Sequence, residues 1–128
     1  MSTSGWVGVD LDGTLAQYDG WKGVDHIGDP VPKMLERVRN WLADGVTVKI
    51  FTARVFLAPE CVTIIQDWCE KHGLPRLEVT NVKDFTMVEL WDDRCYRVKM
   101  NTGELYNTIY KYKPEPTCVQ IPESIPMC

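Results

Sequence analysis

The sequence lacks any long apolar run. No stretch approaches the roughly 20 residues that a membrane-spanning helix needs. Residues 1–5 have neither the basic residues nor the apolar core of a secretion signal. We therefore expect no contact with a membrane and no export, and we place the protein in the cytoplasm.

Cysteines are few and show no metal-binding pattern. The five cysteines are odd in number, and no two of them have the C-x-x-C spacing of a zinc site. Reduced thiols in a cytoplasmic protein are the simplest interpretation of such a set.

Positive charge is in deficit, because 14 basic residues face 18 acidic ones and the net charge is −4. Proteins that bind duplex nucleic acid usually carry a basic excess, so this balance argues against that role. It leaves room for a local basic rim around one site.

The length of 128 residues suits a single domain. We predict that residues 1–113 form this domain. Residues 114–128 contain four prolines and no periodicity, which is typical of an extended tail. We expect the apolar residues of this tail to dock either on the same chain or on a second copy, as in a homo-oligomer.

Short apolar runs predict a series of buried strands. These runs occupy residues 6–9, 46–51, 77–80 and 88–91, and a fifth strand is expected at 96–100 with a turn after it. Helical patterns separate the first three strands. The alternation indicates a three-layer α/β fold with a mostly parallel, Rossmann-like central sheet.

Two helices are predicted from their apolar spacing and their end residues. The first follows Asp29, the expected N-cap, and ends at Gly45. The second opens at Pro59 and is closed by residues 72–75, HGLP, in which glycine comes before proline. Before the first helix, residues 16–29 are rich in glycine and are expected to form an irregular flap.

Reactive side chains follow three of the predicted strands directly. These residues are Asp10, Thr52 and Asp92. In open parallel sheets, ligands bind outside the carboxyl ends of the strands. We therefore expect the three side chains to meet at one rim of the sheet.

The first of these strand ends carries an acid pair, Asp10 and Asp12, followed by Gly13. Two such carboxylates can bind a hard cation through oxygen, or they can divide the roles of nucleophile and acid/base. By itself the pattern also fits a hairpin that turns at Asp12-Gly13. A calcium loop is excluded, because Leu15 and Trp21 stand where glycine and glutamate would be needed.

The second strand end and a later lysine offer groups that bind phosphate. The Thr52 hydroxyl can bind a phosphate oxygen, helped by the backbone N–H groups of Ala53 and Arg54. Lys83 can neutralise a carboxylate and a phosphate together. The ordinary alternatives are a strand-terminal threonine and a solvated lysine paired with Asp84.

A second acid pair, Asp92 and Asp93, follows the fourth strand. Adjacent acids after an apolar strand are unfavourable unless a cation meets them, and a metal ion is the natural candidate. A solvated loop in which Arg94 pairs with these acids is the alternative.

In their order along the chain, these pieces resemble the haloacid dehalogenase superfamily of phosphohydrolases. Residues 10–15, DLDGTL, are similar to its first motif. Thr52 is similar to the second motif, Lys83 to the third, and Asp92-Asp93 to the fourth. The resemblance spans residues 6–94, and Lys83 lies nearer to Asp92 than is usual for the family's lysine.

The resemblance implies a small Mg²⁺-dependent phosphomonoester hydrolase without an inserted cap domain. It implies that Asp10 is the nucleophile that forms an aspartyl-phosphate and that Asp12 is the acid/base. It implies that Asp10, the backbone carbonyl of Asp12, and Asp92 hold Mg²⁺, with Asp93 as a second-shell or alternate ligand. Thr52 and Lys83 would hold the phosphate.

The sequence is compatible with several substrates and with several types of function. A nucleotide, a nucleic-acid 3′-phosphate end and a sugar phosphate all fit; residues 91–94, WDDR, also resemble the ending seen in 3′-phosphatase domains of polynucleotide kinases. A phosphotransferase or mutase, a non-enzymatic receiver-like phosphate-responsive module, and a catalytically silent binding protein are the other readings. Candidate substrate contacts on the flap, which could instead pack it onto the domain, are Tyr18, Trp21, Lys22 and His26.

Overall fold

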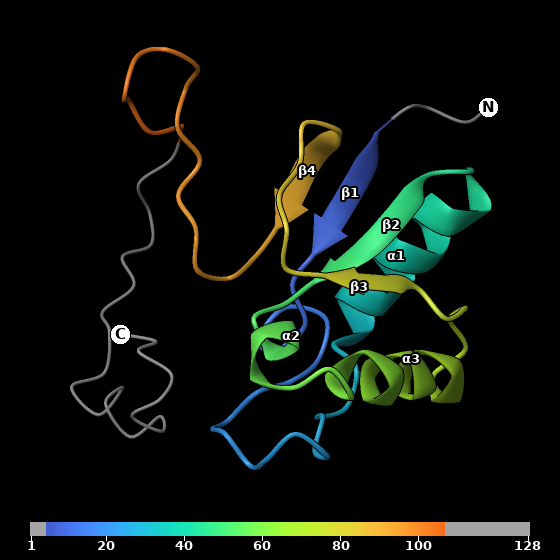
Figure 1. The fold of residues 1–128 in the computed structure, drawn as a ribbon. Helices are drawn as coiled ribbons and strands as arrows, with labels where there is room; N and C mark the ends of the chain where they lie inside the picture. The colour runs from blue at the N-terminus through green and yellow to red at the C-terminus, as the bar shows by residue number, and fades with distance from the viewer. Residues whose placement is uncertain (1–4, 107–128) are drawn as a thin grey trace. The chain divides into compact units, whose positions relative to one another are not determined.

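The structure is a computed structural model that describes residues 5–106 (Figure 1). The chain divides after Asp93 into two compact units, and the described residues are 5–93 of the first and 94–106 of the second. The domain predicted at 1–113 extends across this division. The predicted tail, residues 114–128, lies outside the described residues.

Unit 1 is built on a four-stranded, all-parallel sheet. Its strands are β1 (Trp6–Val9), β2 (Thr47–Phe51), β3 (Glu78–Thr80) and β4 (Met87–Trp91). They lie in the order β3-β2-β1-β4, so β1 pairs with both β2 and β4. The predicted α/β class with a parallel sheet is confirmed, and each strand lies within one residue of its predicted apolar run.

Three helices accompany the sheet: α1 (Pro32–Ala43), the short α2 (Arg54–Leu57) and α3 (Cys61–Lys71). The prediction that Asp29 caps α1 was wrong, because Val31 is the N-cap and Pro32 opens the helix. The Asp29 carbonyl instead accepts a hydrogen bond from Gln17 N at 2.8 Å. Within residues 5–106, no helix has the length and apolar character to cross a membrane.

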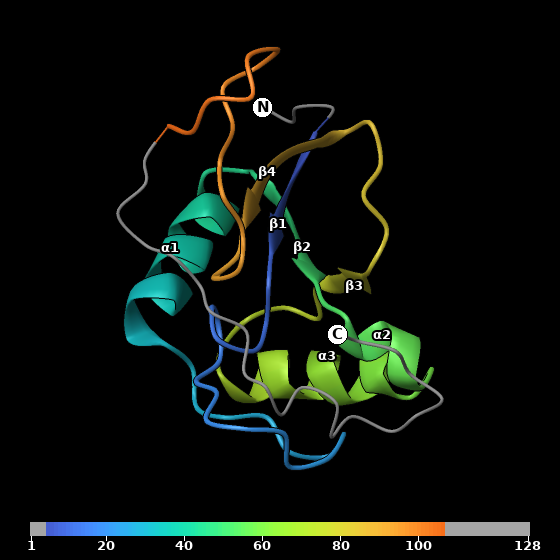
Figure 2. The ribbon, with the colours of Figure 1, turned by 90° about the vertical axis from the view of Figure 1, so that its left-hand side faces the viewer.

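The core of unit 1 lies between α1, α3 and one face of the sheet. Alternate residues of β1 and β2 point to this face and join the buried residues of both helices in one cluster. Figure 2 shows α1 beside these strands. The cluster includes Val7, Val9, Val48, Ile50, Met34, Val38, Ile65 and Cys69.

The predicted third layer is absent from residues 5–106. The connection between β3 and β4, residues 81–86, is a loop with no helix, and six residues leave little room for one. The second face of the sheet carries Trp6, whose ring lies 6.5 Å from the Phe51 ring and 4.6 Å from Lys49 Nζ. No inserted domain separates β1 from α1, where residues 10–31 hold only turns, loops and isolated bridges.

Unit 2 contains a chain reversal in its described part. Val98 and Leu105 form a single antiparallel bridge, and Lys99 N donates to Glu104 O at 2.7 Å. Asn101 takes a positive φ of 67°, as a tight turn requires. The predicted turn is confirmed, whereas the predicted fifth strand is only this isolated bridge.

Candidate active site

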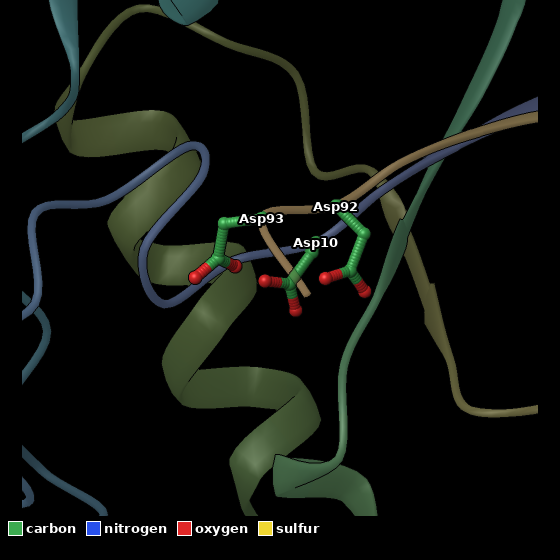
Figure 3. Close-up of side chains that lie close together, drawn as sticks. All are labelled: Asp10, Asp92 and Asp93. Carbon is green, nitrogen blue, oxygen red and sulfur yellow. The ribbon is translucent and has the colours of Figure 1, made fainter. Parts of the chain in front are cut away.

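Asp10 and Asp92 follow the carboxyl ends of the neighbouring strands β1 and β4. Val9 pairs with Trp91, and Asp10 N donates to Trp91 O at 2.9 Å, so the pairing continues past β1. Asp93 comes next along the chain. One carboxylate oxygen from each of Asp10, Asp92 and Asp93 lies within 4.8 Å of the other two (Figure 3). We call these three residues the acidic cluster.

The acidic cluster changes the acidity of Asp10. The pKa of Asp10 is raised from 3.8 to about 8, first by burial and next by the charge of Asp92. A hydrogen bond to Asp93, the charge of Asp93 and the charge of Asp12 contribute the rest of this shift. A nearby cation would favour the ionised form, because opposite charge offsets both the burial and the repulsion.

The loop after β1 folds back and brings Thr14 to the acidic cluster. Leu15 N donates to Asp10 O at 3.2 Å, and Gly13 N donates to Ala16 O at 2.8 Å. The Thr14 hydroxyl lies 3.3 Å from Asp10 Oδ2 and 3.1 Å from Asp93 Oδ1. It also accepts a hydrogen bond from Asp93 N at 3.1 Å, so Thr14 joins the ends of β1 and β4.

Gly13 is needed where this loop passes Asp93. Its φ is +91°, and a Cβ at this position would lie 2.7 Å from Asp93 Oδ2. We expect Gly13→Ala to displace Asp93, to lower the melting temperature and to weaken the Mg²⁺ binding that is predicted for the acidic cluster. Positive φ alone costs an alanine about 1–2 kcal/mol. Thermal melts with and without Mg²⁺ measure both effects.

Gly45→Ala is the matched control for this prediction. Gly45 has a similar φ of +83°, but nothing lies within 4 Å of the position of its Cβ. This variant should be less stable while keeping the full increase in melting temperature on adding Mg²⁺. Equal Mg²⁺ responses of the two variants would contradict the role assigned to Gly13.

Asp12 lies apart from the acidic cluster and pairs with Arg54. Arg54 Nε donates to Asp12 Oδ2 at 2.7 Å, and Arg54 Nη2 donates to Asp12 Oδ1 at 2.9 Å. The Arg54 side chain is 5% exposed and that of Asp12 is 20% exposed. The two acids of the first motif therefore lie in opposite surroundings, Asp10 among acids and Asp12 against a cation.

Thr52 follows β2 and is buried. Its backbone N donates to Thr80 O at 2.9 Å, and its hydroxyl accepts a hydrogen bond from Arg54 N at 3.1 Å. Ala53, the residue between them, is exposed. The backbone N–H of Arg54 and its guanidinium thus both donate hydrogen bonds within the protein. The contact with phosphate expected of Arg54 stays a prediction.

The structure does not bring Lys83 to the acidic cluster. Lys83 is exposed in the loop 81–86 and forms no hydrogen bond or ion pair with any described residue. The adjacent Asp84 accepts a hydrogen bond from Trp6 Nε1 at 3.0 Å, at the start of β1. Asp10 follows the opposite end of β1, and four residues at about 3.3 Å each place it roughly 13 Å from Trp6 along the strand.

The flap candidates fall into two groups. Trp21 is half exposed, and its ring centroid lies 4.8 Å from Arg54 Cζ. Tyr18, Lys22 and His26 line a cavity of about 300 Å³ that the flap itself forms. The residues around this cavity are Gln17, Tyr18, Asp19, Lys22, His26, Ile27, Gly28 and Asp29.

Comparisons with protein-family models, with curated proteins and with solved structures gave no match for this chain. The function is therefore inferred from the residues at the ends of β1, β2 and β4.

Proposed function

We propose that this chain is a Mg²⁺-dependent phosphomonoester hydrolase of the haloacid dehalogenase type. The observation that carries the proposal is the convergence of Asp10, Asp92 and Asp93 at the ends of β1 and β4. Three carboxylates so close together, with the pKa of one raised to about 8, are suited to a bound cation. The substrate would be a phosphorylated small molecule or a nucleic-acid end.

The donor set fits Mg²⁺, which prefers oxygen ligands and is usually bound through a few carboxylates. Asp10, Asp92 and Asp93 would hold the ion, together with the backbone carbonyl of Asp12. When bound, the ion supplies the positive charge that allows a phosphate dianion to approach these acids.

The two acids of the first motif divide the chemistry. The Asp10 carboxylate attacks phosphorus, and the bond from phosphorus to the leaving oxygen breaks as that oxygen takes a proton from Asp12. Asp12 binds Arg54 through both oxygens in this structure, so this step requires Asp12 to gain a proton first. Asp12 then takes a proton from water, whose oxygen attacks the aspartyl-phosphate. Phosphate leaves, and Asp10 is regenerated as a carboxylate.

Hydrolysis of an aryl phosphate with and without Mg²⁺ tests the proposal. We expect turnover with Mg²⁺, loss of turnover in excess chelator, and poor support by Ca²⁺, whose larger and looser coordination misplaces the phosphate. Asp92→Asn should lose activity, whereas Asp67→Asn, on the exposed side of α3, should not. Undiminished activity in chelator would contradict the metal assignment.

A screen of substrates then distinguishes the two candidate classes, phosphorylated small molecules and nucleic-acid ends. Phosphorylated metabolites and 3′-phosphorylated oligonucleotides are compared at equal concentration in Mg²⁺. A preference for one class identifies the physiological type of substrate, and hydrolysis of none of them would contradict the assignment as a phosphatase.

A further inference from the structure

Arg54 contacts Asp12 and the flap, which precede it in sequence by 28 to 42 residues. It is the first residue of α2, directly beyond the end of β2, and it is 4% exposed. Through Nε and Nη2 it binds both oxygens of Asp12, at 2.7 and 2.9 Å. A guanidinium donates in fixed, planar directions, so this paired contact sets the orientation of the carboxylate.

The same guanidinium holds the flap. Arg54 Nη2 donates to His26 O at 2.8 Å, and Arg54 Nη1 donates to Val24 O at 3.2 Å. The Trp21 ring lies against the guanidinium as well, with its centroid 4.8 Å from Arg54 Cζ. One rigid group therefore fixes the carboxylate of Asp12 and the middle of the flap together.

The other hydrogen bonds to the flap hold only its base. Gln17 N donates to Asp29 O at 2.8 Å, and Trp68 Nε1 donates to Gly28 O at 3.0 Å. Among described residues, Arg54 donates all the hydrogen bonds that join residues 18–27 to the rest of unit 1, while Val24 and Ile27 add apolar packing. The hydrogen bonds that hold the middle of the flap and those that hold the Asp12 carboxylate thus come from the same side chain.

We propose that Arg54 is a positioning residue that couples the placement of the flap to the orientation of Asp12. This inference rests on the proposed function, because it gives Asp12 the acid/base role. A substrate that contacts the flap acts through Arg54 on the carboxylate that exchanges a proton with the leaving oxygen. A substrate large enough to contact the flap would thereby influence the orientation of Asp12, although the chain has no inserted cap domain between β1 and α1.

Arg54→Lys is the first variant to test. It keeps the positive charge but lacks the planar fork that binds Asp12 and the two flap carbonyls together. We expect kcat for a small aryl phosphate to fall by up to about 100-fold, with little change in KM or in Mg²⁺ affinity. In the Asp12→Asn background the same change should cost almost nothing, because residues that act through one another are not additive.

Limited trypsin digestion measures the flap without using activity. The bond after Lys22 lies in the flap, and the Lys22 side chain is 50% exposed. Arg54→Lys should speed cleavage of this bond several-fold, as followed by mass spectrometry. Arg76→Lys is the control, since Arg76 binds Asp67 and Glu70 on the surface and should change neither readout.

Trp21→Leu tests whether the placement of the flap affects catalysis through Arg54 or whether Arg54 only supports the fold. It also replaces Arg54→Lys as the test variant if that protein does not fold. It loosens the flap side of Arg54 and leaves both hydrogen bonds to Asp12 in place. Faster cleavage after Lys22 together with a lower kcat supports the coupling. Faster cleavage with an unchanged kcat would overturn it, as would additive losses in the Arg54→Lys, Asp12→Asn double variant. A wild-type protein without Mg²⁺-dependent hydrolysis would overturn the proposed function and this role within it.

Discussion

Replacing Asp10 with asparagine is expected to abolish phosphate-ester hydrolysis while leaving the fold intact. The amide keeps the shape of the side chain but cannot act as the attacking carboxylate. Steady-state kinetics with an aryl phosphate in Mg²⁺ measure the loss, and circular dichroism checks the fold. A variant that retains more than a few per cent of wild-type turnover would contradict covalent catalysis by Asp10.

The same substitution should stabilise the metal-free protein at neutral and higher pH. The pKa of Asp10 is raised from 3.8 to about 8 in the folded state, so folding favours its protonated form. The unfolded chain loses this proton as the pH rises above about 4, and the stability contributed by the group therefore declines between about pH 4 and pH 8. Asparagine has no proton to lose.

Thermal melts in chelator across this pH range measure the effect. The difference in melting temperature between Asp10→Asn and wild type should grow in favour of the variant from pH 4 to pH 8. Mg²⁺ should reverse the order at pH 8, because it binds the wild-type acidic cluster more tightly. A difference that does not vary with pH would contradict the environment assigned to Asp10.

Asp12→Asn should slow turnover by about 10²- to 10⁴-fold, the usual effect of losing an acid/base. It should also destabilise the fold, because Arg54 is buried and loses its charged partner. Hydrogen bonds to charged groups contribute about 1.5–3 kcal/mol each, and the neutral amide recovers part of this. Urea denaturation measures the stability and steady-state kinetics the turnover.

Asp19→Asn provides the comparison for this prediction. Asp19 also pairs with a cation, Lys22, at 2.9 Å, but both side chains are largely exposed and the pair should matter little. We expect no measurable change in stability or turnover. A stable Asp12→Asn protein with normal turnover would contradict both the ion pair and the acid/base role.

The strand pattern could be predicted from the sequence because it depends on local apolar runs. Residues 6–9 read as a buried strand and form β1, and the end of β1 carries Asp10 to the rim of the sheet as expected. The proximity of Asp10 to Asp92 follows from the pairing of β1 with β4 in a parallel sheet, a fold-level rule.

Side-chain partners over long distances could not be predicted in this way. Arg54 binds Asp12, which precedes it by 42 residues, and no local pattern in the sequence indicates that pair. The position of Thr14 between Asp10 and Asp93 depends on the path of one loop. The prediction of a helical layer on the second face of the sheet was wrong, because the six residues 81–86 between β3 and β4 are too few to form a helix there.

Reductive trapping of the phosphorylated enzyme tests the covalent mechanism most directly. Borohydride reduces an acyl phosphate to an alcohol, so an aspartyl-phosphate at Asp10 becomes homoserine during turnover in Mg²⁺. We expect peptide mass spectrometry to find this change at position 10 alone, and in a larger fraction of the Asp12→Asn protein, which hydrolyses the intermediate slowly. Full hydrolytic activity with an unmodified Asp10, or with the change at another acid, would contradict the account.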